Sequence, residues 1–189
     1  MSLTRTLVER LCCFARDCRG LSAVEFGLML PVILGLFMGS FDVGRLALAN
    51  LKIFNAASSM ADLVARDKKI TATTLADLFG AATQIANPFD LSAAGKVIIT
   101  SVSADTDDDP RIFWQSSGAG TLAANSVVGS VVGAVANLPP DLEVEAQETI
   151  IVAEVFYQFV PYFGLLTSTT TVYHSAYYRP RLGTLRQIE

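Results

Sequence analysis

Residues 19–26, Arg19-Gly20-Leu21-Ser22-Ala23-Val24-Glu25-Phe26, open a long apolar run that ends at Phe41. Glu25 lies at the head of this run, and no charged residue follows it between Phe26 and Phe41. A carboxylate in hydrocarbon is costly, so an acidic residue at this place needs either a partner or a polar location. Glu25 is therefore the first residue whose presence requires an explanation.

The apolar run is long enough to cross a bilayer as a helix. With Leu21 to Ala23 added, it approaches the roughly 20 residues that a membrane-spanning helix needs. The short segment before it holds four arginines, Arg5, Arg10, Arg16 and Arg19, and only two acidic residues, Glu9 and Asp17. This excess of positive charge predicts a cytoplasmic N-terminus and an extracytoplasmic remainder. The run is longer than the apolar region of a secretory signal and no small-x-small cleavage site follows it directly. We therefore expect it to remain on the mature protein.

The arrangement of a short basic leader ending in glycine, four small or apolar residues and then Glu-Phe resembles the processing site of type IV prepilins. The neighbouring residues narrow the resemblance to the TadE-like pseudopilins of the tight-adherence (Tad, or Flp) pilus machinery: Arg19-Gly20, Ala23-Val24-Glu25-Phe26, Pro31, Gly39 and Gly44-Arg45. Later pieces also fit this family, namely Val152 to Tyr157 with Pro161, and Arg179-Pro180-Arg181. The Gly-x4-Glu-Phe motif is short, and its specificity comes from its position directly before an apolar helix.

The resemblance implies that prepilin peptidase cleaves after Gly20, so that Leu21 becomes the mature N-terminus and Phe26 helps to present the site. It also implies that Glu25 pairs with the new amino group of Leu21 on a neighbouring subunit, because a paired buried charge costs far less than an unpaired one. The structural alternative is that Glu25 merely lies among lipid headgroups, where a carboxylate is tolerated.

Charge and cysteine content agree with an exported protein. The chain has 14 basic and 18 acidic residues, and removal of the leader's four basic and two acidic residues leaves ten and 16, which argues against nucleic acid as a partner. All three cysteines, Cys12, Cys13 and Cys18, lie in the leader, so the exported part has no thiol to oxidise. Their spacing is not that of a zinc module. The other interpretations are that one of them is reversibly acylated beside the membrane, or that all three are simply small apolar residues of a leader that is discarded.

Inside the apolar run, proline and glycine predict a bend and a packing surface. Pro31 lacks an amide hydrogen, so we expect a bend near it. Gly35 and Gly39 form a Gly-x3-Gly pair, repeated approximately by Ser40 and Gly44, and such a strip lets another helix approach closely. The alternative is that glycine is simply frequent in membrane helices.

Helical periodicity continues beyond Phe41 and predicts one helix from about Leu21 to Arg66. We expect its first half, about 21–42, in lipid, and its second half packed on a soluble domain through one apolar face: Val43, Ala47, Phe54, Ala57, Ala61 and Val64. Asp42, Arg45, Asn50, Lys52, Asn55 and Asp62 are assigned to the other faces.

The remainder, 67–189, is long enough for one domain and predicts an α+β fold. A second helix is expected, with Thr71 or Thr73 as its N-cap and Asn87-Pro88 as its end. Four strands follow from β-branched and aromatic runs, at 96–103, 111–115, 149–160 and 169–178, and they form a small antiparallel sheet against the long helix, as in a pilin. Residues 116–140 are interpreted as a loop that contains at most one short helix.

No residue pattern indicates catalysis or a cofactor. His174 is the only histidine and falls in a strand pattern, so we interpret it as an ordinary strand residue. The acidic loop with Asp105, Asp107, Asp108 and Asp109 lacks the EF-hand frame and is interpreted as solvated, with calcium binding as the alternative. We therefore expect no enzyme, no metal site and no phosphate-binding loop.

Together these observations predict a minor pseudopilin, which the resemblance associates with pilus assembly, cell adhesion and biofilm formation. Its domains are a cytoplasmic leader (1–20), a long helix (21–66) and a periplasmic α+β domain (67–189). The expected partners are prepilin peptidase, other pilins or pseudopilins, and the assembly platform of the inner membrane. Two other classes stay open, an uncleaved single-pass scaffold or sensor and an adhesin-like head on the same anchor.

Overall fold

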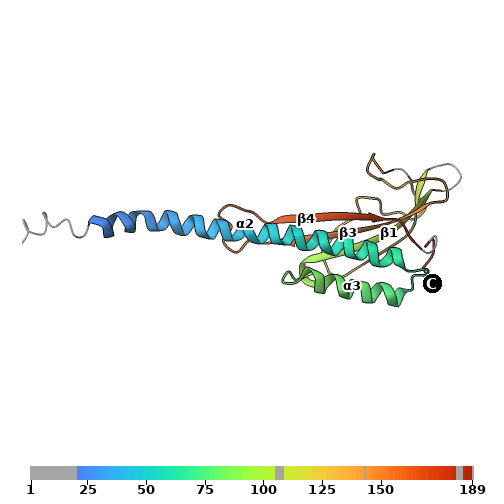
Figure 1. Ribbon diagram of the computed structural model, residues 1–189, viewed down its shortest axis with the longest axis horizontal. Coiled ribbons are helices and arrows are strands. Elements are labelled where there is room, and N and C mark those ends of the chain that lie inside the picture. The colour runs from blue at the N-terminus through green and yellow to red at the C-terminus, as the bar shows by residue number, and fades with distance from the viewer. Residues whose placement is uncertain (1–20, 105–108, 143, 182–184, 189) are drawn as a thin grey trace, which may run out of the picture.

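The computed structural model describes residues 21–104, 109–142, 144–181 and 185–188. Its longest element, helix α2 (Leu21–Arg66), has the bounds that the sequence predicts and continues through Pro31. Figure 1 shows the first half of α2 as a stalk that projects from the rest of the molecule. In the part of the chain that the structure describes, it is the one helix long and apolar enough to cross a membrane, and 6% of its apolar window is buried. The apolar window is therefore not buried as a core helix would be, and it indicates a single-pass membrane protein.

The second half of α2 packs against the sheet and the shorter helices. We call these elements, together with this half of α2, the head domain. The buried residues of this half are mostly small, which lets the sheet approach the helix closely: Ala49, Ile53, Ala56, Ala57, Met60, Ala61, Val64 and Ala65. The predicted apolar face is wrong at its start, because Val43, Ala47 and Phe54 are exposed. Asp42, which we assigned to another face, is fully buried. Periodicity therefore predicted the helix and, at Ala57, Ala61 and Val64, its buried face, but not the residues that are buried before Ala57.

Two shorter helices follow. Helix α3 (Ala72–Ala86) begins after Thr71, the first of the two expected caps, whose hydroxyl oxygen accepts a hydrogen bond from the amide of Thr74 at 3.1 Å. Helix α4 (Leu91–Ala94) is a single turn capped by Asp90, whose carboxylate accepts from the amide of Ala93 at 3.1 Å. Leu75 and Ala82 of α3 and Leu91 of α4 join the same core as α2.

The four strands form one antiparallel sheet in the order β2-β1-β3-β4. Strands β1 (Gly95–Ala104), β2 (Pro110–Gly118), β3 (Thr149–Phe159) and β4 (Thr170–Tyr178) match the four predicted runs closely. Helix α2 packs along β3 and β4, and α3 lies beside α2 (Figure 1). The α+β class and the antiparallel sheet are therefore confirmed.

The segment between β2 and β3 covers the other face of the sheet. It has no helix among its described residues, so the possible short helix in 116–140 is absent there. Its apolar residues form a second small core with the sheet: Val102, Ile112, Val128, Ala136, Ile150 and Val152. Because both faces are covered, ten of the eleven residues of β3 are buried.

A buried carboxylate on β3 fixes this covering segment. Glu154 is fully buried and accepts hydrogen bonds from the Ser126 hydroxyl, the Val127 amide (2.9 Å) and the Tyr173 hydroxyl (3.0 Å). Burial, and to a lesser degree the adjacent Glu154 charge, raises the pKa of Tyr173, so this phenol stays protonated as a donor.

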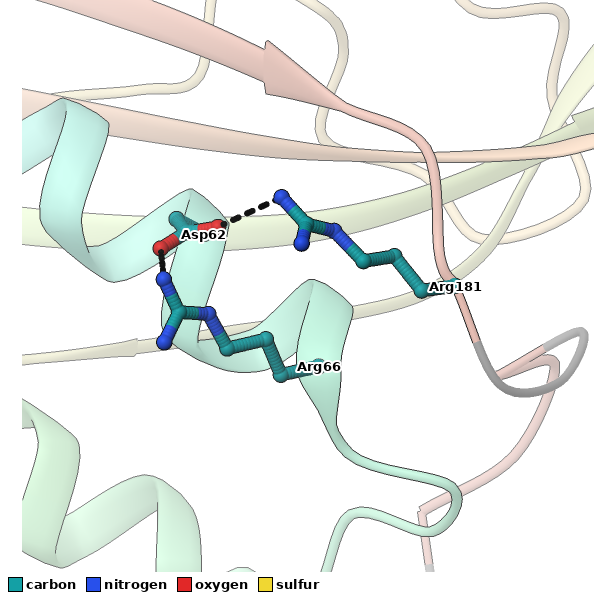
Figure 2. Close-up of polar contacts among 3 residues, drawn as sticks. All are labelled: Asp62, Arg66 and Arg181. Carbon is teal, nitrogen blue, oxygen red and sulfur yellow. Dashed lines mark hydrogen bonds and ion pairs between the residues drawn. The ribbon is translucent and has the colours of Figure 1, made fainter.

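The C-terminal segment returns to the end of α2. The Arg181 amide donates to the Ala65 carbonyl at 2.9 Å, and its guanidinium lies 3.6 Å from the Asp62 carboxylate, which also pairs with Arg66 (Figure 2). Such exposed ion pairs contribute at most about 1 kcal/mol each. The chain is held more firmly at Leu185, whose buried carbonyl accepts from Trp114 Nε1 (2.8 Å) and Ser101 Oγ (3.0 Å).

Candidate functional site

Of the residues predicted for processing, those that the structure describes lie in the first turns of the stalk. Gly20 and the three leader cysteines are outside the described residues, and Leu21 is the first residue of α2. Glu25 and Phe26 are exposed on the first turns of the helix. Within 21–104, 109–142, 144–181 and 185–188, no group hydrogen-bonds to Glu25 or pairs with it. Its carboxylate is thus available to a second molecule.

The three glycines predicted for helix packing have different surroundings. Gly39 is buried under Leu166, and a Cβ added there would collide with that side chain. A Cβ at Gly35 would lie 3.8 Å from Leu165, whereas one at Gly44 would meet nothing within 4 Å. The face around Gly35 and Gly39 is therefore partly occupied by the chain's own β3–β4 connection. Packing of a partner helix on the remaining surface stays a prediction.

Asp42 joins the stalk to this connection. Its Oδ1 accepts from the Tyr162 amide at 2.9 Å, and its Oδ2 accepts from the amides of Phe163 (2.9 Å) and Gly164 (2.8 Å). Gly164 has φ +67°, a left-handed conformation that glycine adopts without strain. Three successive amides around one carboxylate form an anion-binding turn that holds residues 162–164 on the helix.

Arg45, one turn further along α2, continues the junction with aromatic contacts. Its guanidinium carbon lies 3.8 Å from the centre of the Tyr162 ring and 5.5 Å from that of Phe159. The distance to Tyr162 is short enough for a cation–π interaction. Burial raises the pKa of Tyr157, which packs nearby on Phe89, while the Arg45 charge partly opposes that shift.

The connection between β3 and β4 is apolar and exposed. We call residues 160–167 the junction loop. Five of its eight residues are large apolar or aromatic residues with 47–71% of their surface exposed: Val160, Tyr162, Phe163, Leu165 and Leu166. Phe41 of α2 lies 6.1 Å, between ring centres, from both Tyr162 and Phe163.

Sequence reasoning missed the junction of Asp42 with this loop. Asp42 was assigned only to a face of the helix other than the apolar one, and Pro161 was noticed only as part of the family resemblance. The available signal was the run Val160-Pro161-Tyr162-Phe163-Gly164-Leu165-Leu166, which is unusually apolar for a connection between two antiparallel strands.

The other candidate residues lie apart from the junction. His174 is a half-buried residue of β4, as predicted; its Nε2 lies 3.3 Å from Asn50 Oδ1, and its ring meets Phe54 edge to face. Asp109 is exposed and lies 4.0 Å from Arg111. Asp105, Asp107 and Asp108 are outside the described residues, so the calcium alternative stays untested. The residues that are described contain no group of three potential metal ligands.

Comparison with known proteins supports the part of the resemblance that lies on helix α2, and not the later pieces at 152–161 and 179–181. No curated protein and no solved structure matches the chain significantly. A family model described as TadE-like protein matches residues 20–62, which is less than a quarter of the 189 residues and leaves the sheet uncovered. The matched segment contains the Gly20 site, Glu25, the glycine strip and Asp42. From residue 20 to residue 62, along nearly all of α2, this chain is similar to TadE-like proteins, which supports a protein associated with tight-adherence (Tad) pili.

Proposed function

We propose that this protein is a minor pseudopilin for the assembly of a tight-adherence pilus, cleaved by prepilin peptidase after Gly20. The observation that carries the proposal is the TadE-like match at residues 20–62, which begins at the cleavage position itself. The protein is the substrate of the peptidase and has no catalytic role of its own. Its partners are the peptidase, other pilins or pseudopilins, and the assembly platform.

The exposed stalk supports this role. Apolar side chains are exposed on every side of its first half, and neighbouring helices or lipid must cover them: Val24, Phe26, Leu28, Met29, Val32, Ile33, Leu36 and Phe37. Glu25 lies among them without a partner in the described residues. After cleavage, a neighbouring subunit would supply the positive amino group of Leu21. The pairing would stabilise the correct register of adjacent helices, because an unpaired charge in that bundle is strongly disfavoured.

Location follows from the same assignment. The protein spans the inner membrane once, with the arginine-rich leader in the cytoplasm and the head domain in the periplasm. Before assembly, the bilayer covers the stalk. During assembly, the helices of other subunits replace the lipid.

The decisive experiment is the N-terminal sequence and intact mass of the membrane-extracted protein, from cells with and without active prepilin peptidase. The proposal expects a start at Leu21 that depends on the peptidase. A start at Met1 in both cells would refute it and leave an uncleaved scaffold or sensor. Gly27→Ala is a suitable control for changes at Gly20, because Gly27 is exposed and an added Cβ meets nothing within 4 Å.

A further inference from the structure

We propose that the junction loop, residues 160–167, is a second membrane-contacting element that inserts into the leaflet next to the head domain. Its ligand is the lipid of that leaflet. The inference rests on the membrane span of α2 and holds whether or not the leader is cleaved.

The depth of the loop follows from its contacts with the stalk. Leu166 covers Gly39, and Leu165 lies against Gly35. Both glycines belong to the uncharged run that ends at Phe41. At 1.5 Å per residue, the six residues from Gly35 to Phe41 correspond to roughly 9 Å along the helix. The 21 residues from Leu21 to Phe41 provide about 31 Å, little more than the hydrocarbon thickness of a bilayer of about 30 Å. If α2 spans the membrane, Leu165 and Leu166 must therefore lie below its surface.

The side chains of the loop suit that depth. Leu165 is 58% exposed, Leu166 63% and Phe163 47%, and no protein surface among the described residues covers these fractions. Tyr162, at 71% exposure, lies beside Asp42 and Arg45, where the apolar run ends. An aromatic residue with a hydroxyl group is favoured at the membrane–water interface, with aliphatic residues deeper. The loop thus has the composition of an interfacial anchor.

The backbone of the loop is also prepared for lipid. Irregular backbone is costly in hydrocarbon because its amides lack water as a partner. Here the amides of Tyr162, Phe163 and Gly164 all donate to Asp42. This carboxylate therefore removes three unsatisfied donors from the segment that enters the membrane. Together with the stalk, the loop would give the head domain two points of attachment and a fixed orientation.

The test is a depth measurement by spin labelling of the full-length protein in phosphatidylcholine–phosphatidylglycerol vesicles at low protein density. Cys12, Cys13 and Cys18 are first replaced by serine, and a single cysteine is introduced as Leu165→Cys. The matched control is Val132→Cys, because Val132 is 59% exposed on the opposite covering segment, almost the same as Leu165 at 58%. Any difference between the two labels then reflects the membrane.

At position 165, we expect collisions with oxygen, which concentrates in hydrocarbon, to dominate over collisions with a water-soluble nickel chelate, and the reverse at position 132. Alkylation of the unlabelled cysteine by a charged reagent should be about tenfold slower at 165 than at 132, because the thiolate is the reactive form and lipid disfavours it. Equal nickel accessibility at the two positions would overturn the proposal. Shielding of position 165 from both oxygen and nickel would also overturn it, because it would show that a protein surface covers the loop.

Discussion

The carboxylate of Asp42 should control whether the junction loop stays on the stalk, and Asp42→Ala tests this directly. The change removes the acceptor of three amide hydrogen bonds of 2.8–2.9 Å. It also removes the negative charge that interacts with Arg45, one turn along the helix. Asp42→Asn is the graded variant. Its amide keeps one oxygen but turns an NH2 group toward at least one donor of the loop.

The magnitude can be worked from these contacts. A hydrogen bond to a charged group contributes about 1.5–3 kcal/mol, and removing one partner of a buried pair costs about 3–5 kcal/mol. In detergent solution the loop is largely exposed, so water or detergent headgroups can replace part of what is lost. We therefore expect local opening of the loop to become easier by about 3 kcal/mol in Asp42→Ala, which corresponds to roughly a 100-fold loss of protection. Asp42→Asn should lose less.

Hydrogen–deuterium exchange of the full-length protein in one detergent reports this opening at residues 162–164. Asp77→Asn is the control, because Asp77 is an exposed residue of α3. It should leave exchange in the loop unchanged. If the three amides exchange as slowly in Asp42→Ala as in the unmodified protein, the carboxylate does not hold the loop and the reasoning fails.

Three other changes have expected outcomes. Glu154→Leu leaves the donors on Ser126, Val127 and Tyr173 without an acceptor. Thermal unfolding followed by circular dichroism should therefore show a free energy of unfolding that is lower by about 3 kcal/mol. A smaller decrease than in Glu154→Gln would contradict this account. Gly39→Ala should displace Leu166 and speed amide exchange at 165–167, whereas Gly44→Ala should not, because an added Cβ at Gly44 meets nothing within 4 Å. Equal effects of the two changes would show that the loop does not pack on Gly39. In the cell, Gly20→Ala should slow or block cleavage, seen as a larger mass, and Glu25→Ala should reduce pilus assembly more than membrane insertion; normal piliation in both variants would contradict the pseudopilin assignment.

Much of the fold could be predicted from local sequence because its elements are long and regular. The bounds of α2 follow from an uninterrupted helical period, and α3 from the Thr71 cap and the Asn87-Pro88 stop. The four strands follow from runs of β-branched and aromatic residues. The face that α2 buries was predicted correctly at Ala57, Ala61 and Val64 and wrongly at Val43, Ala47 and Phe54, because alanine at many positions leaves the period of the apolar face ambiguous. Which side is covered is then decided by β3, β4 and the junction loop.

The sequence by itself determined the membrane-spanning helix, the position of Glu25 at its head, the TadE-like motif and the α+β class, because each depends on residues adjacent in the chain. Only the tertiary structure decided that Asp42 is buried and that an apolar loop lies on the glycines of the stalk. Asp42 and Gly164 are 122 residues apart, and their contact exists only because the antiparallel pairing of β3 with β4 returns the chain to the helix at that level. A carboxylate and a distant loop carry no local signal of each other. Their association is a property of the folded sheet.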